Sequence, residues 1–97
     1  MKTYTVKIES GVQIIIECVD ENMKIYDGLI SYLDKSKDVK YIKKAMTFET
    51  PISDYEYKDI PFSVLFDEMC DETFVFVEKL YDYRLIEQLL HKFDIIN

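Results

Sequence analysis

The stretch TYTVKIESGVQIIIECV, residues 3–19, decides how the fold of this chain is predicted. Polar and apolar side chains alternate over residues 3–9 and again over residues 12–19, and Ser10-Gly11 separates the two runs. Alternation at a period of two is typical of β-strands, and a two-residue connection that includes glycine is typical of a tight hairpin. The sequence therefore predicts an N-terminal β-hairpin.

The segment that follows the hairpin changes to helical periodicity. Its apolar residues recur at steps of three and four, so they share one side of a helix that follows residue 20: Met23, Tyr26, Leu29, Ile30 and Leu33. Residues 39–49 fit both periodicities. We favour a strand there because the segment has β-branched and aromatic residues and because Pro51 follows it.

The second half of the chain is harder to assign. Residues 50–60 predict a loop with a short extended segment at Tyr55-Glu56-Tyr57. Proline is common in the first turn of a helix, so residues 61–70 favour a helix, with a strand as the alternative. Residues 73–78 predict a strand that is apolar on both sides, and we expect it to be central and covered on both faces. Residues 81–93 predict a closing helix.

The predicted order β-β-α-β-(α)-β-α indicates an α+β fold. We expect an antiparallel or mixed sheet of about four strands, packed by two or three helices. A length of 97 residues fits a single domain over residues 1–97.

The cellular compartment is predicted from the absence of targeting segments and of paired cysteines in the sequence. We find no apolar segment typical of a signal peptide or of a membrane span. Cys18 and Cys70 lie far apart, without a C-x-x-C motif, so a reducing, cytoplasmic compartment is the expectation.

The charge is divided unequally between the two halves. The formal net charge is -7. Eight basic residues stand against seven acidic ones over residues 1–48, and four basic residues stand against twelve acidic ones over residues 49–97. Such asymmetry favours a charged partner, although acidic residues also keep small domains soluble.

The residue types that catalysis needs are nearly absent. His91 is the single histidine, and Arg84 and Gln88 lie beside it at helical spacing, so we expect it on a solvated surface. Gly11 and Gly28 are the only glycines, which excludes a glycine-rich phosphate-binding loop. Neither the EF-hand pattern nor the ligand spacing of a zinc site is present. We therefore predict no enzyme activity, no metal and no cofactor.

The predicted binding site is the acid-rich part of the second half. Carboxylates at strand or helix spacing can approach the charge density of a phosphate backbone. The acidic candidates are Glu49, Asp54, Glu56, Asp59, Asp67, Glu68, Asp71 and Glu72. Tyrosines between them would add aromatic contacts, and these candidates are Tyr55, Tyr57 and Tyr81. The expected partner is a basic protein, such as a nucleic-acid-binding enzyme, and we expect no direct binding of nucleic acid or membranes.

In size, charge and lack of catalytic motifs, the chain resembles the small acidic inhibitors of phages and mobile elements, including anti-CRISPR and DNA-mimic proteins. The resemblance implies an inhibitor that blocks the basic nucleic-acid-binding surface of a host nuclease or regulator, and it assigns no role to any residue. One alternative is a small adaptor, immunity-type or regulatory module that binds a protein through a sheet edge or a helix face. Another is a structural homodimer with Ile15, Val19 and the tyrosines at its interface.

Overall fold

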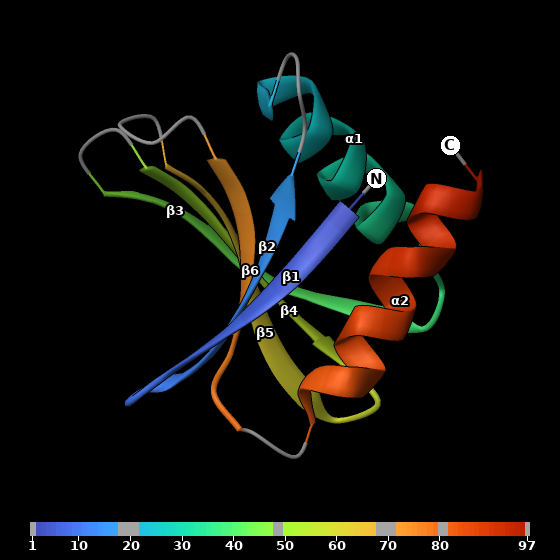
Figure 1. The fold of residues 1–97 in the computed structure, drawn as a ribbon. Helices are drawn as coiled ribbons and strands as arrows, with labels where there is room; N and C mark the ends of the chain where they lie inside the picture. The colour runs from blue at the N-terminus through green and yellow to red at the C-terminus, as the bar shows by residue number, and fades with distance from the viewer. Residues whose placement is uncertain (1, 18–21, 48–49, 68–71, 80–81, 97) are drawn as a thin grey trace.

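The computed structural model describes residues 2–17, 22–47, 50–67, 72–79 and 82–96. These residues form six strands and two helices (Figure 1). In chain order the elements are β1 (Lys2–Ile8), β2 (Gly11–Glu17), α1 (Asn22–Lys35), β3 (Val39–Thr47), β4 (Thr50–Tyr57), β5 (Ile60–Asp67), β6 (Glu72–Val77) and α2 (Tyr83–Ile96). None of the described helices has the length and apolar character needed to cross a membrane.

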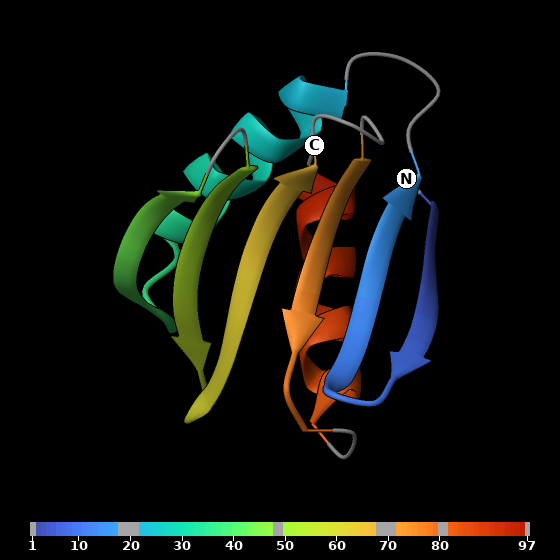
Figure 2. The ribbon, with the colours of Figure 1, turned by 90° about the vertical axis from the view of Figure 1, so that its left-hand side faces the viewer.

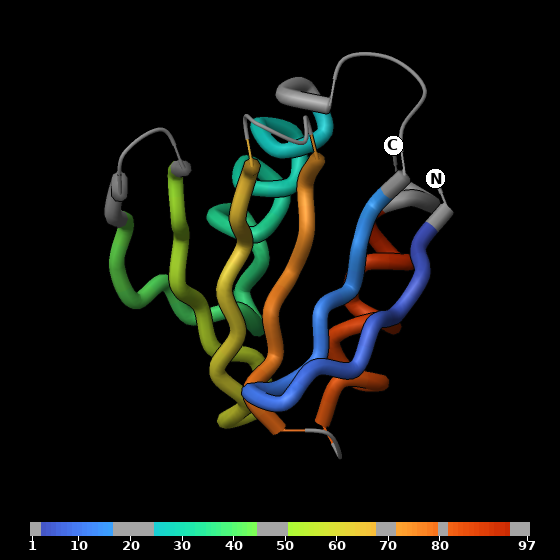
Figure 3. The backbone as a smooth tube through the Cα atoms, turned by 60° about the vertical axis from the view of Figure 1, so that its left-hand side comes forward, coloured from blue at the N-terminus to red at the C-terminus, as the bar shows by residue number. Residues whose placement is uncertain are grey.

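All six strands belong to one antiparallel sheet with the order β1-β2-β6-β5-β4-β3. Strands β3 to β6 pair with their neighbours in sequence and form a meander, which Figure 3 follows along the backbone. The hairpin of β1 and β2 joins this meander through β2 and β6. The predicted α+β class is confirmed, whereas the expected number of about four strands is corrected to six.

Both helices cover the same face of the sheet. Figure 1 views the sheet nearly edge-on with the helices on its right, and Figure 2 shows both helices behind the strands. Alternate strand residues point toward the helices and are buried, as the pattern of β5 illustrates with Ile60, Phe62, Val64 and Phe66. The core therefore lies between one sheet face and two helices, and we call this side of the sheet the covered face.

The N-terminal hairpin is confirmed, with a turn one residue earlier than predicted. Ile8 pairs with Gly11, so the connection is Glu9-Ser10. Gly11 begins β2 at a point where the neighbouring strand approaches closely. A Cβ atom at this position would lie 2.5 Å from the carbonyl oxygen of Val77, which explains why glycine stands here.

The two segments around the prolines differ from the predictions. Residues 50–57 form strand β4, where a loop with a short extended segment is predicted, and residues 60–67 form strand β5, which is the alternative to the favoured helix. Each proline lies near the start of its strand, where the second neighbouring strand has not yet begun to pair. Pairing of β4 with β5 starts at Ile52, after Pro51, and pairing of β5 with β6 starts at Phe62, after Pro61. A missing N–H is tolerated at such positions.

Strand β6 is central, as predicted, but only one of its faces is covered by helices. Thr73, Val75 and Val77 are buried under the helices, while Phe74 and Phe76 are half-buried on the other face. The expectation of cover on both sides is therefore corrected. The helices predicted after residue 20 and over residues 81–93 are confirmed, with Leu29 and Leu33 of α1 buried in the core. Residue 20, after which the first helix is predicted to follow, lies outside the described residues.

Candidate docking face

The face of the sheet opposite the helices has no element of the described chain packed on it (Figure 2). We call it the open face. Strand alternation and register assign to it these apolar residues: Tyr4, Val6, Ile8, Ile15, Ile42, Ile52, Pro61, Leu65, Phe74 and Phe76. A solvated sheet face is usually polar, so this composition sets the open face apart.

Exposure of the apolar side chains is greatest near the two margins of the open face. Tyr4 is 45% exposed and Ile8 38% on β1, and Ile42 is 44% exposed on β3. Between them Phe74 and Phe76 are half-buried by their neighbours within the sheet. Ile15 of β2 is only 9% exposed, opposite Tyr4 on one side and Phe74 on the other. Apolar residues thus continue across the sheet from one margin to the other.

A depression of about 300 Å³ lies in the open face across strands β3 to β6. Ile42, Pro61 and Phe76 supply apolar walls, and the carboxylates of Asp54, Glu56 and Glu78 also line it. All six side chains come from strands or from the residue just after a strand, so a rigid sheet positions them. The depression therefore offers apolar surface together with carboxylates that could bind a cationic group.

Ser63 fixes one of the three carboxylates. Its hydroxyl donates a hydrogen bond of 2.6 Å to Asp54 Oδ1 from the neighbouring strand. The opposite side of Asp54 faces Lys43 of β3, and Glu56 faces Lys40 in the same register. The acids of β4 therefore lie next to lysines of the first half of the chain, and the negative charge is interrupted there.

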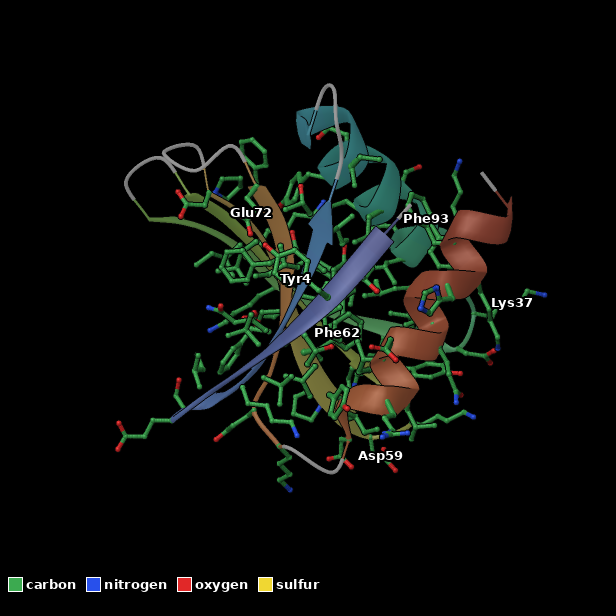
Figure 4. All side chains as sticks on the ribbon, viewed as in Figure 1. Tyr4, Lys37, Asp59, Phe62, Glu72 and Phe93 are labelled. Carbon is green, nitrogen blue, oxygen red and sulfur yellow. The ribbon has the colours of Figure 1, made fainter. Side chains whose placement is uncertain are left out.

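A second group of acids lies at the other end of β5. Asp67 and Glu72 are direct cross-strand partners on the open face, where two like charges oppose each other. Asp59 belongs to the turn between β4 and β5, at the far end of the same strand. Figure 4 shows Asp59 and Glu72 at opposite ends of the sheet. The described acids are thus divided among three places rather than joined in one row.

The structure places two of the three predicted binding tyrosines in the core. Tyr55 is 1% exposed and Tyr57 is 6% exposed, and both point toward the helices. The Tyr55 hydroxyl donates a hydrogen bond of 2.9 Å to Asp34 Oδ1 of α1. Burial, together with this bond to a carboxylate, raises the pKa of Tyr55 well above its ordinary value. These two side chains belong to the core, although Tyr55 is also among the residues that line the depression.

The remaining candidates fall outside the described residues: Glu49, Glu68, Asp71 and Tyr81. Of the candidates that the structure describes, it brings Asp54 and Glu56 together in the depression and pairs Asp67 with Glu72. Sequence reasoning missed the apolar part of the site. The sequence of residues 73–78 could have indicated it, because strand alternation places Phe74 and Phe76 on the face opposite Val75 and Val77.

Other chemistry is sparse in the described part of the chain. His91 is exposed on α2, as expected. Among the described residues, no three His, Cys, Asp or Glu side chains gather as a group that could hold a metal ion.

Comparison with known proteins adds no relative to these observations. No protein-family model matches the chain, and no curated protein or solved structure is significantly similar to it.

Proposed function

We propose that this chain is a non-catalytic binding protein that docks a basic protein partner on its open face. The observation that carries the proposal is the contiguous apolar surface of an uncovered sheet face, with carboxylates set into it. The hydrophobic core is already formed between the two helices and the covered face. Core formation alone therefore does not explain why the open face carries apolar residues. Exposed, continuous apolar surface of this kind is typical of interaction sites.

The apolar residues would form the centre of the interface. Phe74 and Phe76 lie on the central strand β6, with Leu65 and Ile15 beside them in the register. Aromatic residues are enriched in the buried centre of interfaces, where they contribute much of the binding free energy. Because the strands hold these side chains in place, the partner would bind a preorganised surface.

The depression would accept a basic side chain of the partner. Arginine and lysine carry an apolar stem below a cationic head, and the stem matches the walls formed by Ile42, Pro61 and Phe76. The head would lie among Asp54, Glu56 and Glu78. Arginine fits this role better than lysine, because its planar guanidinium donates hydrogen bonds to two carboxylates at once.

Blocking a nucleic-acid-binding groove is a narrower form of the same proposal. A mimic of nucleic acid would need a continuous row of unneutralised charge. In the described chain, Lys40 and Lys43 lie opposite Glu56 and Asp54, and the remaining acids lie at the sheet ends. This distribution favours the broader function, in which apolar contact and one or a few basic side chains together select the partner.

The first experiment measures binding of synthetic peptides that carry one arginine between apolar residues. The matched probe replaces arginine by citrulline, which keeps the shape and removes the charge. Fluorescence anisotropy should show preference for arginine, and the variant Asp54→Asn with Glu56→Gln should weaken binding roughly tenfold or more. The control variant Asp27→Asn with Asp38→Asn removes two exposed acids outside the open face and should bind as the parent does. Equal affinity for both peptides would refute the proposed role of the carboxylates.

A second experiment tests the natural partner. A protein captured by the parent chain should be lost with Phe76→Ser and retained with Gln88→Ser, which changes an exposed residue of α2. If the captured protein binds nucleic acid, competition with duplex DNA tests whether this chain blocks the nucleic-acid-binding groove. Displacement of the chain by DNA would support blocking of the groove, and simultaneous binding would limit the function to docking elsewhere on the partner.

A further inference from the structure

The two edges of the sheet differ in how they are protected against pairing with another strand. Edge strand β3 has a β-bulge between Tyr41 and Lys43, and it also carries Lys40 and Lys44. A bulge and lysines are the devices by which proteins blunt an edge. Lys44 Nζ also lies 3.6 Å from Asp34 Oδ2, which ties this edge to α1.

Edge strand β1 has no bulge, and its two lysines, Lys2 and Lys7, lie near its ends. Its seven residues pair with β2 in unbroken register, from Lys2 opposite Glu17 to Ile8 opposite Gly11. It contains neither proline nor bulge. Figure 2 shows β1 as the outer margin of the sheet, with α2 behind β6 and β2 and nothing drawn beyond β1. The outward side of this strand is therefore accessible to an added strand.

The register identifies which backbone groups point outward. The two-residue connection makes Ile8 and Gly11 a hydrogen-bonded pair, and such pairs alternate along an antiparallel ladder. The backbone groups of Tyr4, Val6 and Ile8 therefore point toward β2. Those of Thr3, Thr5 and Lys7 point away from the sheet.

We propose that β1 pairs with β1 of a second copy of this chain, antiparallel and centred on Thr5. In this register Thr5 lies opposite its own copy, and Thr3 lies opposite Lys7. The three outward residues of each chain would then form three hydrogen-bonded pairs, each with two bonds. The result is a twofold, isologous interface, the commonest form of homodimer.

Charge and side-chain pairing favour a second copy as the occupant. Neither lysine of β1 would face a lysine, because Lys7 lies opposite Thr3 and Lys2 lies opposite Ile8. On the open face Tyr4 would lie opposite Val6, which is a favourable aromatic and β-branched pair. A threonine pair would lie on the covered side at Thr5, whose hydroxyl also donates to Glu87 Oε2 at 3.3 Å. This register thus avoids a contact between lysines and pairs an aromatic side chain with a β-branched one.

The dimer would extend the sheet without covering the docking face. A twofold axis perpendicular to the sheet keeps the helices of both copies on one side. Both open faces would then lie together on the other side. The dimer would thus present two depressions, one per copy, to the same partner or to two partners.

Hydrogen exchange of the unmodified chain tests the pairing directly. If the dimer forms, the amides of Thr3, Thr5 and Lys7 should exchange more slowly as the protein concentration rises. The amides of Tyr4, Val6 and Ile8 should be protected at every concentration, because β2 already binds them. Fast exchange at the first three positions in sub-millimolar protein would overturn the proposal, as would a monomer mass by light scattering under the same conditions.

Charge variants test the register. Thr3→Lys places two lysines opposite each other twice per dimer, and it should weaken dimerisation roughly tenfold. Adding Lys7→Glu to that variant should restore the dimer, which a merely unfolded variant would not do. The matched control Gln88→Lys adds the same charge on the exposed side of α2 and should leave the dimer unchanged. A dimer that Thr3→Lys does not weaken would refute this register.

A cysteine at the symmetry axis gives an independent readout. Thr5→Cys should cross-link to its own copy under mild oxidation, because paired Cα atoms about 5.5 Å apart are within disulfide range. Lys7→Cys should not cross-link to its own copy, since it lies opposite Thr3. The reverse result would show that the two strands pair in another register.

Discussion

The two faces of one sheet share the same strands but differ in what they contribute. On the covered face, Val64 and Val75 are fully buried under the helices. The adjacent residues on the same strands, Leu65 and Phe74, are only half-buried on the open face. In an antiparallel sheet with one solvated face, those positions would normally be polar. The covered face therefore serves stability, while the apolar residues of the open face are those that the proposed docking would use.

The largest expected difference between the faces is in core packing. Phe66 is 4% exposed on the covered face, with its ring centroid 6.2 Å from that of Tyr26. Phe66→Ala should lower the free energy of unfolding by about 3–5 kcal/mol. Phe74→Ala on the open face should cost less than half of this, since its side chain is already partly in water. Chemical denaturation measures both, and equal losses would contradict the division of roles.

Glycine-to-alanine substitutions should have opposite effects on stability at Gly11, where a Cβ atom meets the backbone, and at Gly28, where it does not. A Cβ at Gly11 would approach the Val77 carbonyl to 2.5 Å, so Gly11→Ala should cost about 1–3 kcal/mol. At Gly28 of α1 the nearest atom, Cζ of Phe93, would be 3.5 Å away, which is ordinary contact. Gly28→Ala should therefore stabilise the chain by about 0.5–1 kcal/mol. Thermal unfolding should move in opposite directions for the two variants.

The buried tyrosine of the covered face should make stability depend on alkaline pH. The pKa of Tyr55 is raised in the folded state, so its contribution is complete below pH 10 and is lost as pH rises above that value. Tyr55→Phe should cost about 1 kcal/mol at neutral pH, because Asp34 loses a hydrogen bond but remains partly hydrated. Above pH 10 the variant should lose stability less steeply than the parent. Tyr41→Phe removes an exposed hydroxyl and should follow the parent curve.

The smallest expected effect concerns the charges of the open face. Lys43 and Asp54 are cross-strand partners, and a double-mutant cycle with Lys43→Ala and Asp54→Ala should give a coupling of about 0.2–1 kcal/mol. High salt should reduce this coupling. The cycle of Lys37→Ala with Asp54→Ala should be additive, because Lys37 lies on the helix side of the molecule (Figure 4), whereas Asp54 lies on the open face. Coupling in the control cycle would show that long-range charge effects dominate.

The secondary structure could be predicted in those segments where the apolar residues follow a single period. Alternation identified the N-terminal hairpin, and steps of three and four identified both helices. The helix favoured over residues 61–70 is wrong, and the alternative of a strand is right, because the apolar residues there fit two periods at once. Phe62, Leu65 and Phe66 fit a helix, whereas Phe62, Val64 and Phe66 fit a strand. Pairing with β4 on one side and β6 on the other decides in favour of the strand, and such long-range pairing cannot be read from local spacing.

The candidate site was only partly predictable for a related reason. Acidic residues are recognisable in any sequence, but their relative positions depend on register. Residues Asp54 and Glu56 come together with Glu78 only because β5 and β6 lie beside β4 in the folded sheet. Tyr55 was expected on the surface because it lies between two acids, yet strand alternation turns it to the opposite side from them. Which face the helices cover decides which of these residues a partner could reach.

The way the N-terminal hairpin joins the sheet has a consequence for folding kinetics. Strands β3 to β6 bring together segments that are close in sequence, so the entropy lost on closing each loop is small. Val12 of β2, by contrast, must find Val77 of β6 near the other end of the chain. We therefore expect the meander to assemble early and the hairpin to dock late. In the reverse direction, transient detachment of the hairpin should be the lowest-energy opening of the native molecule, exposing the edge of β6 before the rest unfolds.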